Sequence, residues 1–218
     1  PYGSPMVEST RDRLVEAANH AFAEHGILGA SLVEVTRQAG QRNRGAVHYH
    51  FGGRDQLLAA VLEQHADFLA RREGELLAAA RTRSDDDVAS VVEAVVRPCV
   101  ELAEGGDSGR NYVEIVGELI EQDPATRSAD VEAMLAHTGG YEVYELLGER
   151  LPAMDEELRT ERIALMTSFV IGSVARRVRA KSTGPGARES PLSNERFVVN
   201  LVTMATAMLC APLVPVDL

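Results

Sequence analysis

The chain has 218 residues, 45% of them hydrophobic, and a formal net charge of −11 at pH 7. This length and apolar content exclude a disordered chain and are sufficient for one or two packed domains. The acidic balance excludes a protein that coats nucleic acid over its whole surface.

Charge is unevenly distributed along the sequence. Residues 1–54 carry six Arg and five acidic residues, whereas residues 55–218 carry a net charge of −12. The stretch from Val35 to Arg54 contains four Arg and no Asp or Glu. A locally basic head on an acidic body fits contact with DNA through one small face, and from charge alone the alternative is a chance cluster of solvated Arg.

Three short helices are expected at the start of the chain. Apolar residues at helical spacing predict a helix over 11–25. Ser31 and Glu34 have the spacing of a capping box, so a second helix is expected to begin there and to run as far as residue 39. After a short turn, a third helix is expected over 44–50.

Longer helices are expected in the remainder of the chain. A fourth helix begins at Arg54, and no sustained alternation of polar and apolar residues indicates a strand. The sequence therefore predicts an all-α fold. The further helices are expected over 86–104, 109–122, 129–136, 139–150, 155–181 and 194–211.

Neither a metal site nor a cofactor is expected. Cys99 and Cys210 stand far apart, with no partner at metal-ligand spacing. The opening Pro1–Met6 has no apolar segment of a signal peptide and is left out of the fold. Polar residues and Pro212 interrupt the uncharged run 197–214, which favours a buried helix over a membrane span. We therefore expect a soluble, cytoplasmic protein.

The second and third helices have the proportions of a helix-turn-helix motif, whose second helix lies in the major groove of DNA. Arg pairs with guanine and Asn with adenine, small residues permit close approach, and His and Tyr donate hydrogen bonds to phosphate. The residues expected to contact DNA are Thr36, Arg37, Arg42, Asn43, Arg44, Gly45, His48, Tyr49, His50 and Arg54.

Three segments resemble, in order and spacing, the signature of the TetR family of bacterial transcriptional regulators. The turn between the second and third helices is one residue longer than usual, which leaves open which of Arg42, Asn43 and Arg44 reach base edges. The segments that carry the resemblance are Ala39-Gly40, Arg44-Gly45-Ala46-Val47-His48-Tyr49-His50-Phe51 and Arg54-Asp55-Gln56-Leu57-Leu58.

The resemblance is detailed over residues 10–70 and extends beyond them only in length and helical character. It implies a three-helix helix-turn-helix DNA-binding domain over 10–54. It also implies a helical domain over 55–218 that binds a small-molecule effector and forms a homodimer. The implied function is a repressor that a small, largely apolar ligand releases from a palindromic operator in double-stranded DNA, while activation stays open.

Two sets of residues are candidates for the effector site and the dimer interface, and for both the alternative is that they only fill the core of the monomer. The effector candidates, which combine apolar bulk with polar tips, are Tyr112, Ile115, Val116, Leu119, Met134, His137, Tyr141, Tyr144 and Phe169. The dimer candidates, on the last two helices, are Met166, Val170, Val174, Leu201, Met204 and Met208.

Two other classes of protein are alternatives to a transcriptional regulator. They are a helical enzyme, and a ligand-binding or adaptor protein without specific DNA binding. Residues 106–109 spell the tetrapeptide around the nucleophile of trypsin-like serine proteases, but those proteins are β-barrels with further catalytic residues. No other catalytic motif is present. The sequence therefore predicts that the protein is not an enzyme.

Overall fold

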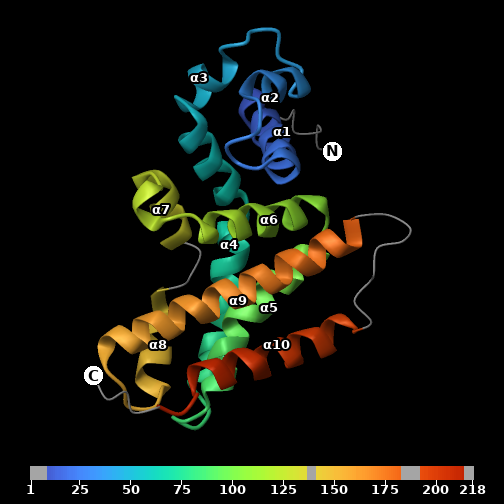
Figure 1. Ribbon diagram of the computed structural model, residues 1–218. Helices are drawn as coiled ribbons and strands as arrows, with labels where there is room; N and C mark the ends of the chain where they lie inside the picture. Colours follow the sequence, from blue (N-terminus) through green and yellow to red (C-terminus); the bar gives the residue numbers. More distant parts are fainter. Residues whose placement is uncertain (1–8, 137–140, 183–191, 214–218) are drawn as a thin grey trace, which may run out of the picture.

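A computed structural model of the chain describes residues 9–136, 141–182 and 192–213 (Figure 1). Within these ranges every regular element is a helix, as the sequence predicted. The opening segment Pro1–Met6 and the effector candidate His137 lie outside the described residues.

The head consists of α1 (Thr10–His25), α2 (Leu32–Gln38) and α3 (Ala46–Phe51). A reciprocal capping box begins α1, in which Ser9 Oγ accepts from the Asp12 amide and the Asp12 carboxylate accepts from the Ser9 amide, each at 3.1 Å. These local signals explain why the position of α1 was predictable from sequence.

The capping box predicted for α2 forms only in part. Ser31 Oγ accepts from the amide of Glu34 at 3.4 Å, but the Glu34 carboxylate turns to Arg37, with 2.8 Å between Oε2 and Nε. A charge-assisted hydrogen bond to a guanidinium is stronger than one to a neutral backbone amide. The helix therefore starts where predicted, with one of its two capping bonds replaced.

A single long helix, α4 (Arg54–Ala80), joins the head to the body. It contacts α1 and α3 of the head as well as α5 and α7 of the body, and Figure 1 shows it running from one part into the other. The predicted domain boundary at residue 54 coincides with the start of this continuous helix, and a boundary there stays a prediction.

The body is built around α5, which contacts α4, α6, α8, α9 and α10. Its valines and alanines face neighbours on several sides, with Val91, Val92 and Val96 fully buried. A short 3-10 helix, η1, precedes α7, which packs against α4. The body elements are α5 (Val88–Glu104), α6 (Asp107–Glu121), η1 (Pro124–Thr126), α7 (Ala129–Leu135), α8 (Tyr141–Arg150), α9 (Glu156–Ser182) and α10 (Asn194–Leu209).

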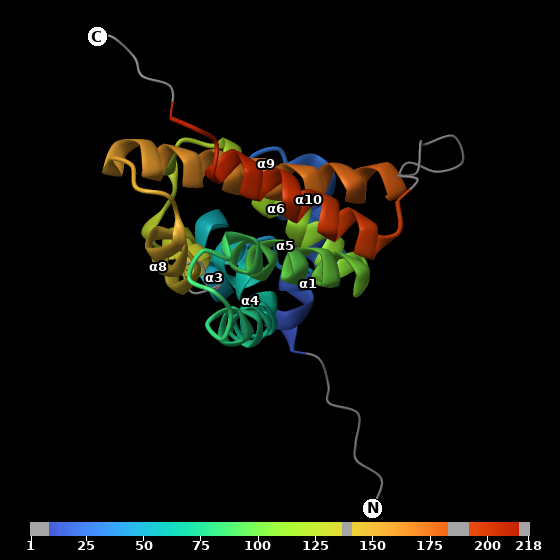
Figure 2. The same cartoon turned by 90° about the horizontal axis from the view of Figure 1, so that it is seen from below.

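The last two helices, α9 and α10, lie side by side and form one outer face of the body (Figure 2). Both pack inward on α5. Across the ranges that the structure describes, none of the helices combines the length and apolar character needed to cross a membrane.

Arg150, at the end of α8, ties three helices of the body together. It is only 8% exposed, and its guanidinium donates to the carbonyls of Ala80 at 2.8 Å and Asp87 at 3.0 Å and to Ser90 Oγ at 3.2 Å. The end of α4, the start of α5 and α8 are therefore held in register by one buried cation whose charge is met by several acceptors.

Candidate DNA-contact and effector sites

The turn that precedes α3 presents the three candidates whose roles the sequence left open. Arg42, Asn43 and Arg44 are all exposed and lie before the helix, because α3 begins at Ala46 rather than at residue 44. The Asn43 side-chain oxygen accepts from the amide of Gly45 at 3.0 Å. This Asn therefore shapes the turn in the free protein, while Arg42 and Arg44 have exposed side chains on either side of it.

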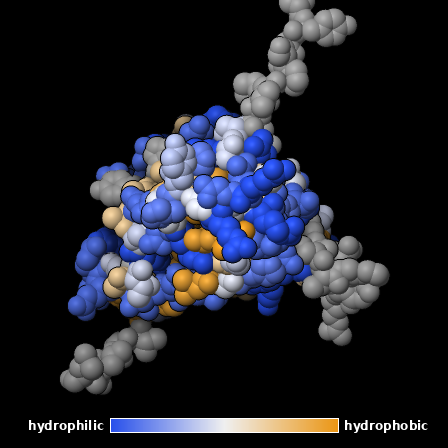
Figure 3. All heavy atoms as spheres, turned by 90° about the horizontal axis from the view of Figure 1, so that it is seen from above, coloured by the Kyte–Doolittle hydropathy of each residue, from blue (hydrophilic) through white to orange (hydrophobic). Residues whose placement is uncertain are grey.

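One side of α3 packs into the head and the other is open to solvent. Val47 is buried, whereas His48 and His50 are exposed and Tyr49 is 83% exposed. The Tyr49 and His50 rings meet edge to face, with 5.0 Å between their centroids. Figure 3 shows the molecule from the end where Figure 1 places α2 and α3, and its surface there is mainly hydrophilic. The exposed side of α3 thus carries aromatic and imidazole groups that can donate to phosphate.

Arg54 has a structural role that the sequence reasoning missed. Its guanidinium donates to the carbonyls of Ile27 and Ala30, the latter at 2.8 Å, and lies 6.0 Å from the ring centroid of Phe22. The residue therefore holds the α1–α2 connection against the start of α4. In this conformation two of its nitrogens are already engaged, so the phosphate contact expected of Arg54 needs these bonds to be shared or broken.

Two candidates on α2 are also placed differently from expectation. Thr36 is 1% exposed, and its hydroxyl donates to the carbonyl of Leu32 at 2.8 Å, so it packs inside the head and its DNA contact stays a prediction. Arg37 is exposed but bound by both carboxylate oxygens of Glu34. That guanidinium lowers the pKa of Glu34 to about 2, which keeps the pair charged at neutral pH.

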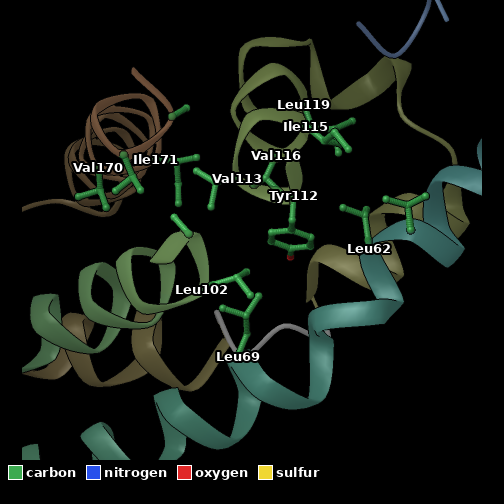
Figure 4. Packing of buried hydrophobic residues seen from close by; sticks show 14 of the residues in the cluster. Leu62, Leu69, Leu102, Tyr112, Val113, Ile115, Val116, Leu119, Val170 and Ile171 are labelled. Carbon is green, nitrogen blue, oxygen red and sulfur yellow. The ribbon is translucent and has the colours of Figure 1, made fainter. Parts of the chain in front are cut away.

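Four effector candidates on α6 lie in the hydrophobic core. Tyr112, Ile115, Val116 and Leu119 are each at most 8% exposed. Figure 4 shows Tyr112 pointing from α6 into the space between α4 and α5, where Leu62, Leu69 and Leu102 surround it. The structure thus places these four residues in the core of the monomer, as the alternative to an effector site expects. A ligand contact by any of them stays a prediction.

The other effector candidates are closer to the surface or not described. Met134 and Phe169 are partly buried against the core, and Tyr144 is 36% exposed. The side chain of Tyr141 lies, like His137, outside the described residues.

The sequence reasoning missed a buried acid, Glu73, that interacts electrostatically with Tyr144. Glu73 of α4 is 7% exposed, and burial first and Glu142 second raise its pKa to about 8. Its Oε1 has no hydrogen-bond partner among the described residues. The signal was available in the sequence, because Glu73 stands between Leu69 and Leu77 at four-residue spacing on the apolar stripe of α4.

Titratable groups on two other helices, α5 and α8, interact electrostatically with this acid. Cys99 of α5 has its pKa raised to about 12 by burial and by Glu73. Burial also raises the pKa of Tyr144, a hydrogen bond with Thr167 of α9 (3.1 Å between the oxygens) opposes that rise, and Glu73 and Cys99 add to it. We call Glu73, Cys99, Tyr144 and Thr167 the Glu73 cluster. It joins α4, α5, α8 and α9.

Two hollows in the described part of the chain lie away from the Glu73 cluster. A cavity of about 40 Å³ opens between α5, α6 and α9 beside Arg177, and a shallow groove of about 360 Å³ runs along the outside of α10. Neither is lined by a residue predicted to bind the effector. The groove lining is Leu192, Glu195, Arg196, Val199, Asn200 and Thr203.

Helix α6 is bonded to the head by polar contacts. Both carboxylate oxygens of Glu118 accept from the backbone amide of Ile27 at 3.0 Å, in the α1–α2 connection. Asn111 donates to Asn19 Oδ1 at 2.8 Å, and Asn19 is fully buried in α1. The same helix packs on α5 and α9 of the body. A displacement of α6 therefore reaches the head directly.

The dimer candidates divide between the interior and the surface. Met166, Val170, Val174 and Leu201 are at most 2% exposed within one chain, so they fill its core, and a direct contact of any of them with a partner stays a prediction. These four residues pack inward because their stripe faces α5 and its neighbours. The apolar residues that α9 and α10 expose are instead Leu165 (52%), Val199 (56%), Met204 (47%) and Met208 (36%).

Nothing in the described structure provides the setting that the protease-like tetrapeptide needs. Ser108 stands in the first turn of α6, in a helical fold, and its hydroxyl lies 3.1 Å from Nε2 of His65. This pair joins α4 to α6. Over the described ranges, no three His, Cys, Asp or Glu side chains are grouped so that they could hold a metal ion.

Comparison with protein families accounts for most of the chain. Residues 14–61 match the family described as bacterial regulatory proteins, tetR family. Residues 93–208, more than half of the chain, match the tetracyclin repressor-like C-terminal domain. These families and the matched relatives are transcriptional regulators rather than enzymes.

Individual relatives match in sequence over a short stretch, whereas solved structures match over nearly the whole chain in fold. The transcriptional regulator SrpR of Pseudomonas putida is 44% identical over 55 residues, a stretch that covers 25% of each chain. Among solved structures, the TetR-family regulator PfmR from Thermus thermophilus matches with a TM-score of 0.54 at 16% identity over 96% of this chain and 100% of its own. AibR, solved with isovaleryl coenzyme A and operator DNA, matches with a TM-score of 0.57 at 15% identity over 94% and 100%. At these identities the two structures are similar to this chain in fold alone.

Proposed function

The chain belongs to the TetR family of bacterial regulatory proteins, and from this premise we propose that it is a homodimeric repressor released from a palindromic operator by a small-molecule effector. Family membership establishes a DNA-binding transcriptional regulator. The palindromic operator, the effector and the dimer are what we propose here.

The observation that carries the proposal is the composition of the exposed turn and helix of the head. Arg42, Arg44 and Tyr49 are exposed, and no Asp or Glu occurs in the twenty residues around them. Arg side chains can pair bidentately with guanine, and Tyr can fix the protein to phosphate. An acid-free surface of this kind supports binding to DNA on an otherwise acidic chain.

The outer face of α9 and α10 supports a dimer. Leu165, Val199, Met204 and Met208 are exposed on two helices that lie side by side, and exposed apolar side chains gathered in this way mark interaction surfaces. A second copy packed on this face brings two heads together under a two-fold axis. Two such heads suit half-sites about one helical turn apart, or a multiple of that distance.

The contacts of helix α6 support a coupling between effector binding in the body and operator binding by the head. It packs on α5 and α9 at one side and holds the α1–α2 connection through Glu118 at the other. An effector that favours a displaced α6 changes the position of the heads and so lowers affinity for the operator. Couplings of this kind amount to about 1–3 kcal/mol.

The test is recovery of genomic fragments by the purified protein at moderate salt, read by sequencing. We expect one or a few enriched palindromic sites. Uniform weak recovery that disappears as salt rises indicates phosphate contact alone and overturns the proposed specificity.

A variant pair assigns the specificity to the head. The double substitution Arg44→Ala and Tyr49→Ala is expected to lower affinity for the enriched site by at least about 100-fold, because a base contact and a phosphate contact are both lost. Arg71→Ala, an exposed Arg of α4 paired with Glu75, serves as the matched control and is expected to bind as the wild type does. Unchanged binding by the double variant contradicts the assignment of the recognition surface.

A further inference from the structure

Glu73 occupies a position where packing calls for an apolar side chain. The residues before and after it on the same stripe of α4, Leu69 and Leu77, are 6% and 1% exposed, and Glu73 itself is 7% exposed. A carboxyl group there loses its contact with water. Burial of a polar group is tolerated when a partner replaces that water, and it costs about 1–3 kcal/mol when none does.

The protein supplies no cation to this carboxyl group among the described residues. The titratable side chains that act on it or respond to it are Cys99 on α5 and Tyr144 and Glu142 on α8. All of these are neutral or negative. Arg81 lies in the same region but is bound to Glu142 at 3.1 Å. Within the described ranges, Glu73 Oε1 is left without a hydrogen-bond partner.

From this geometry we propose that the effector is a cationic amphiphile, an apolar molecule whose protonated amine binds the carboxylate of Glu73 inside the body. The inference rests on the proposed function, because it names the class of effector that the regulator senses. The phenol of Tyr144 and the hydroxyl of Thr167, 3.1 Å apart, line the same cluster. A carboxylate attracts an ammonium group by charge, and the two hydroxyl oxygens can accept further hydrogen bonds from it.

The charges in the cluster decide between ligand classes. An anionic ligand meets no cation in the cluster and is repelled by Glu142. A neutral alcohol donates one hydrogen bond and gains nothing from charge. An ammonium makes a charge-assisted hydrogen bond to the ionised carboxylate in a setting with little water, where such bonds are strong.

Binding of an amine has a proton balance that can be measured. Burial and Glu142 hold the pKa of Glu73 at about 8 in the free protein, so its carboxyl group is mostly protonated at pH 7. The ligand arrives as R–NH₃⁺ and keeps its proton, since alkylammonium groups titrate near pH 10. The carboxyl group therefore releases its proton to water as the ion pair forms, and close to one proton is released per ligand.

The experiment compares three probes of one shape and different charge by isothermal titration calorimetry. The probes are 4-phenylbutylamine, 4-phenylbutan-1-ol and 4-phenylbutyrate, tested against the full chain at pH 7. We expect the amine to bind at least about tenfold more tightly than the alcohol, and the carboxylate to bind most weakly. Titrations in two buffers with different heats of ionisation are expected to show release of a proton with the amine alone.

Two matched variants assign the effect to one residue. Glu73→Gln keeps the shape of the side chain and is expected to fold, because it removes a buried acid without opening a cavity. Its affinity for the amine is expected to fall at least about tenfold, with loss of proton release and unchanged affinity for the alcohol. Glu75→Gln makes the same change two residues away on α4, at an exposed site bound to Arg71 and Arg72, and is expected to behave as the wild type does.

Three results overturn the inference: no detectable binding of the amine, equal affinity for amine and alcohol, or full amine affinity and proton release in Glu73→Gln. Calorimetry without DNA keeps these results separate from the proposed function. A chain that binds the amine but enriches no operator contradicts the repressor and leaves the cation site intact. A chain that binds its operator but not the amine contradicts the cation site and leaves the proposed repressor intact.

Discussion

A carboxyl group at position 73 makes the stability of the body depend on pH. Burial raises its pKa to about 8, whereas a Glu in the unfolded chain titrates near 4.5. Between these values the folded protein binds more protons than the unfolded one. The free energy of unfolding therefore falls as pH rises from about 4.5 to 8 and is level above that.

The substitution Glu73→Gln is expected to remove this dependence. At pH 8.5 the variant should be more stable than the wild type by about 2–4 kcal/mol, while at pH 4.5 the two should be close, since one pKa unit corresponds to about 1.4 kcal/mol. Urea unfolding at both pH values measures the difference. Glu75→Gln is the control, and a wild-type curve that stays flat from pH 5 to 8 contradicts the buried-acid account.

Arg150 is also a buried ionisable residue but, unlike Glu73, its charged group has hydrogen-bond partners within the protein. Three acceptors from α4 and α5 meet its guanidinium. Arg150→Met should lower the free energy of unfolding by about 2–4 kcal/mol, because buried carbonyls lose a charged donor. Thermal unfolding measures this loss, with exposed Arg71→Met as the control. A loss no larger than in the control means that the three bonds contribute little.

At the scale of elements, α6 is the part of the body bonded to the head. Its Glu118 accepts from the amide of Ile27, which belongs to the connection that Arg54 also holds. The α1–α2 connection is thus fixed from two helices, α4 and α6. One contact is a carboxylate that can move with α6, and the other is a guanidinium on the helix that carries the head.

Glu118→Gln tests whether this bond positions the head. A neutral amide oxygen accepts more weakly than a carboxylate, so hydrogen exchange at the Ile27 amide should become faster by roughly tenfold. Operator affinity should change by several-fold, with thermal stability nearly unchanged. Glu121→Gln, an exposed acid on the same helix, is the control. Unchanged exchange at Ile27 and unchanged operator affinity contradict a positioning role for Glu118.

At the scale of the whole molecule, a monomer leaves the outer face of α9 and α10 exposed to water. Val199, Met204 and Leu165 lie on it with about half of their surface accessible. The inward stripe of the same two helices is already used by the core. A dimer therefore depends on a different set of side chains from those that hold the monomer together.

The double substitution Val199→Glu and Met204→Glu should convert the dimer to a folded monomer. Charges of one sign brought together at a two-fold interface repel each other and lose water. Sedimentation at micromolar concentration measures the state, and operator affinity is expected to fall by more than about tenfold. Leu28→Glu, at a still more exposed apolar residue of the head, should leave the dimer intact. A double variant that still sediments as a dimer places the interface elsewhere.

The sequence by itself determined the elements and their order. The described α-helices begin within about two residues of the predicted starts, and those with a predicted end finish within about two residues of it, whereas α4 runs on to Ala80 with no end predicted. The agreement arises because apolar periodicity, capping serines and glycines act over a few neighbouring residues. The head was recognisable for the same reason, since its motif lies in one continuous stretch. The family matches over 14–61 and 93–208 confirm the assignment.

Only the tertiary structure decided what each side chain faces. In the tertiary structure, Met166 and Val170 face the core and Thr36 is buried. Arg54 donates to backbone carbonyls of residues more than twenty positions away. The tertiary structure also buries Glu73 where titratable groups of α5 and α8 act on it or respond to it. A periodic stripe shows that one side of a helix is apolar, but whether that side meets its own core or a second chain depends on how distant helices pack. The same holds for a buried charge, whose partner or lack of one is set by residues remote in sequence.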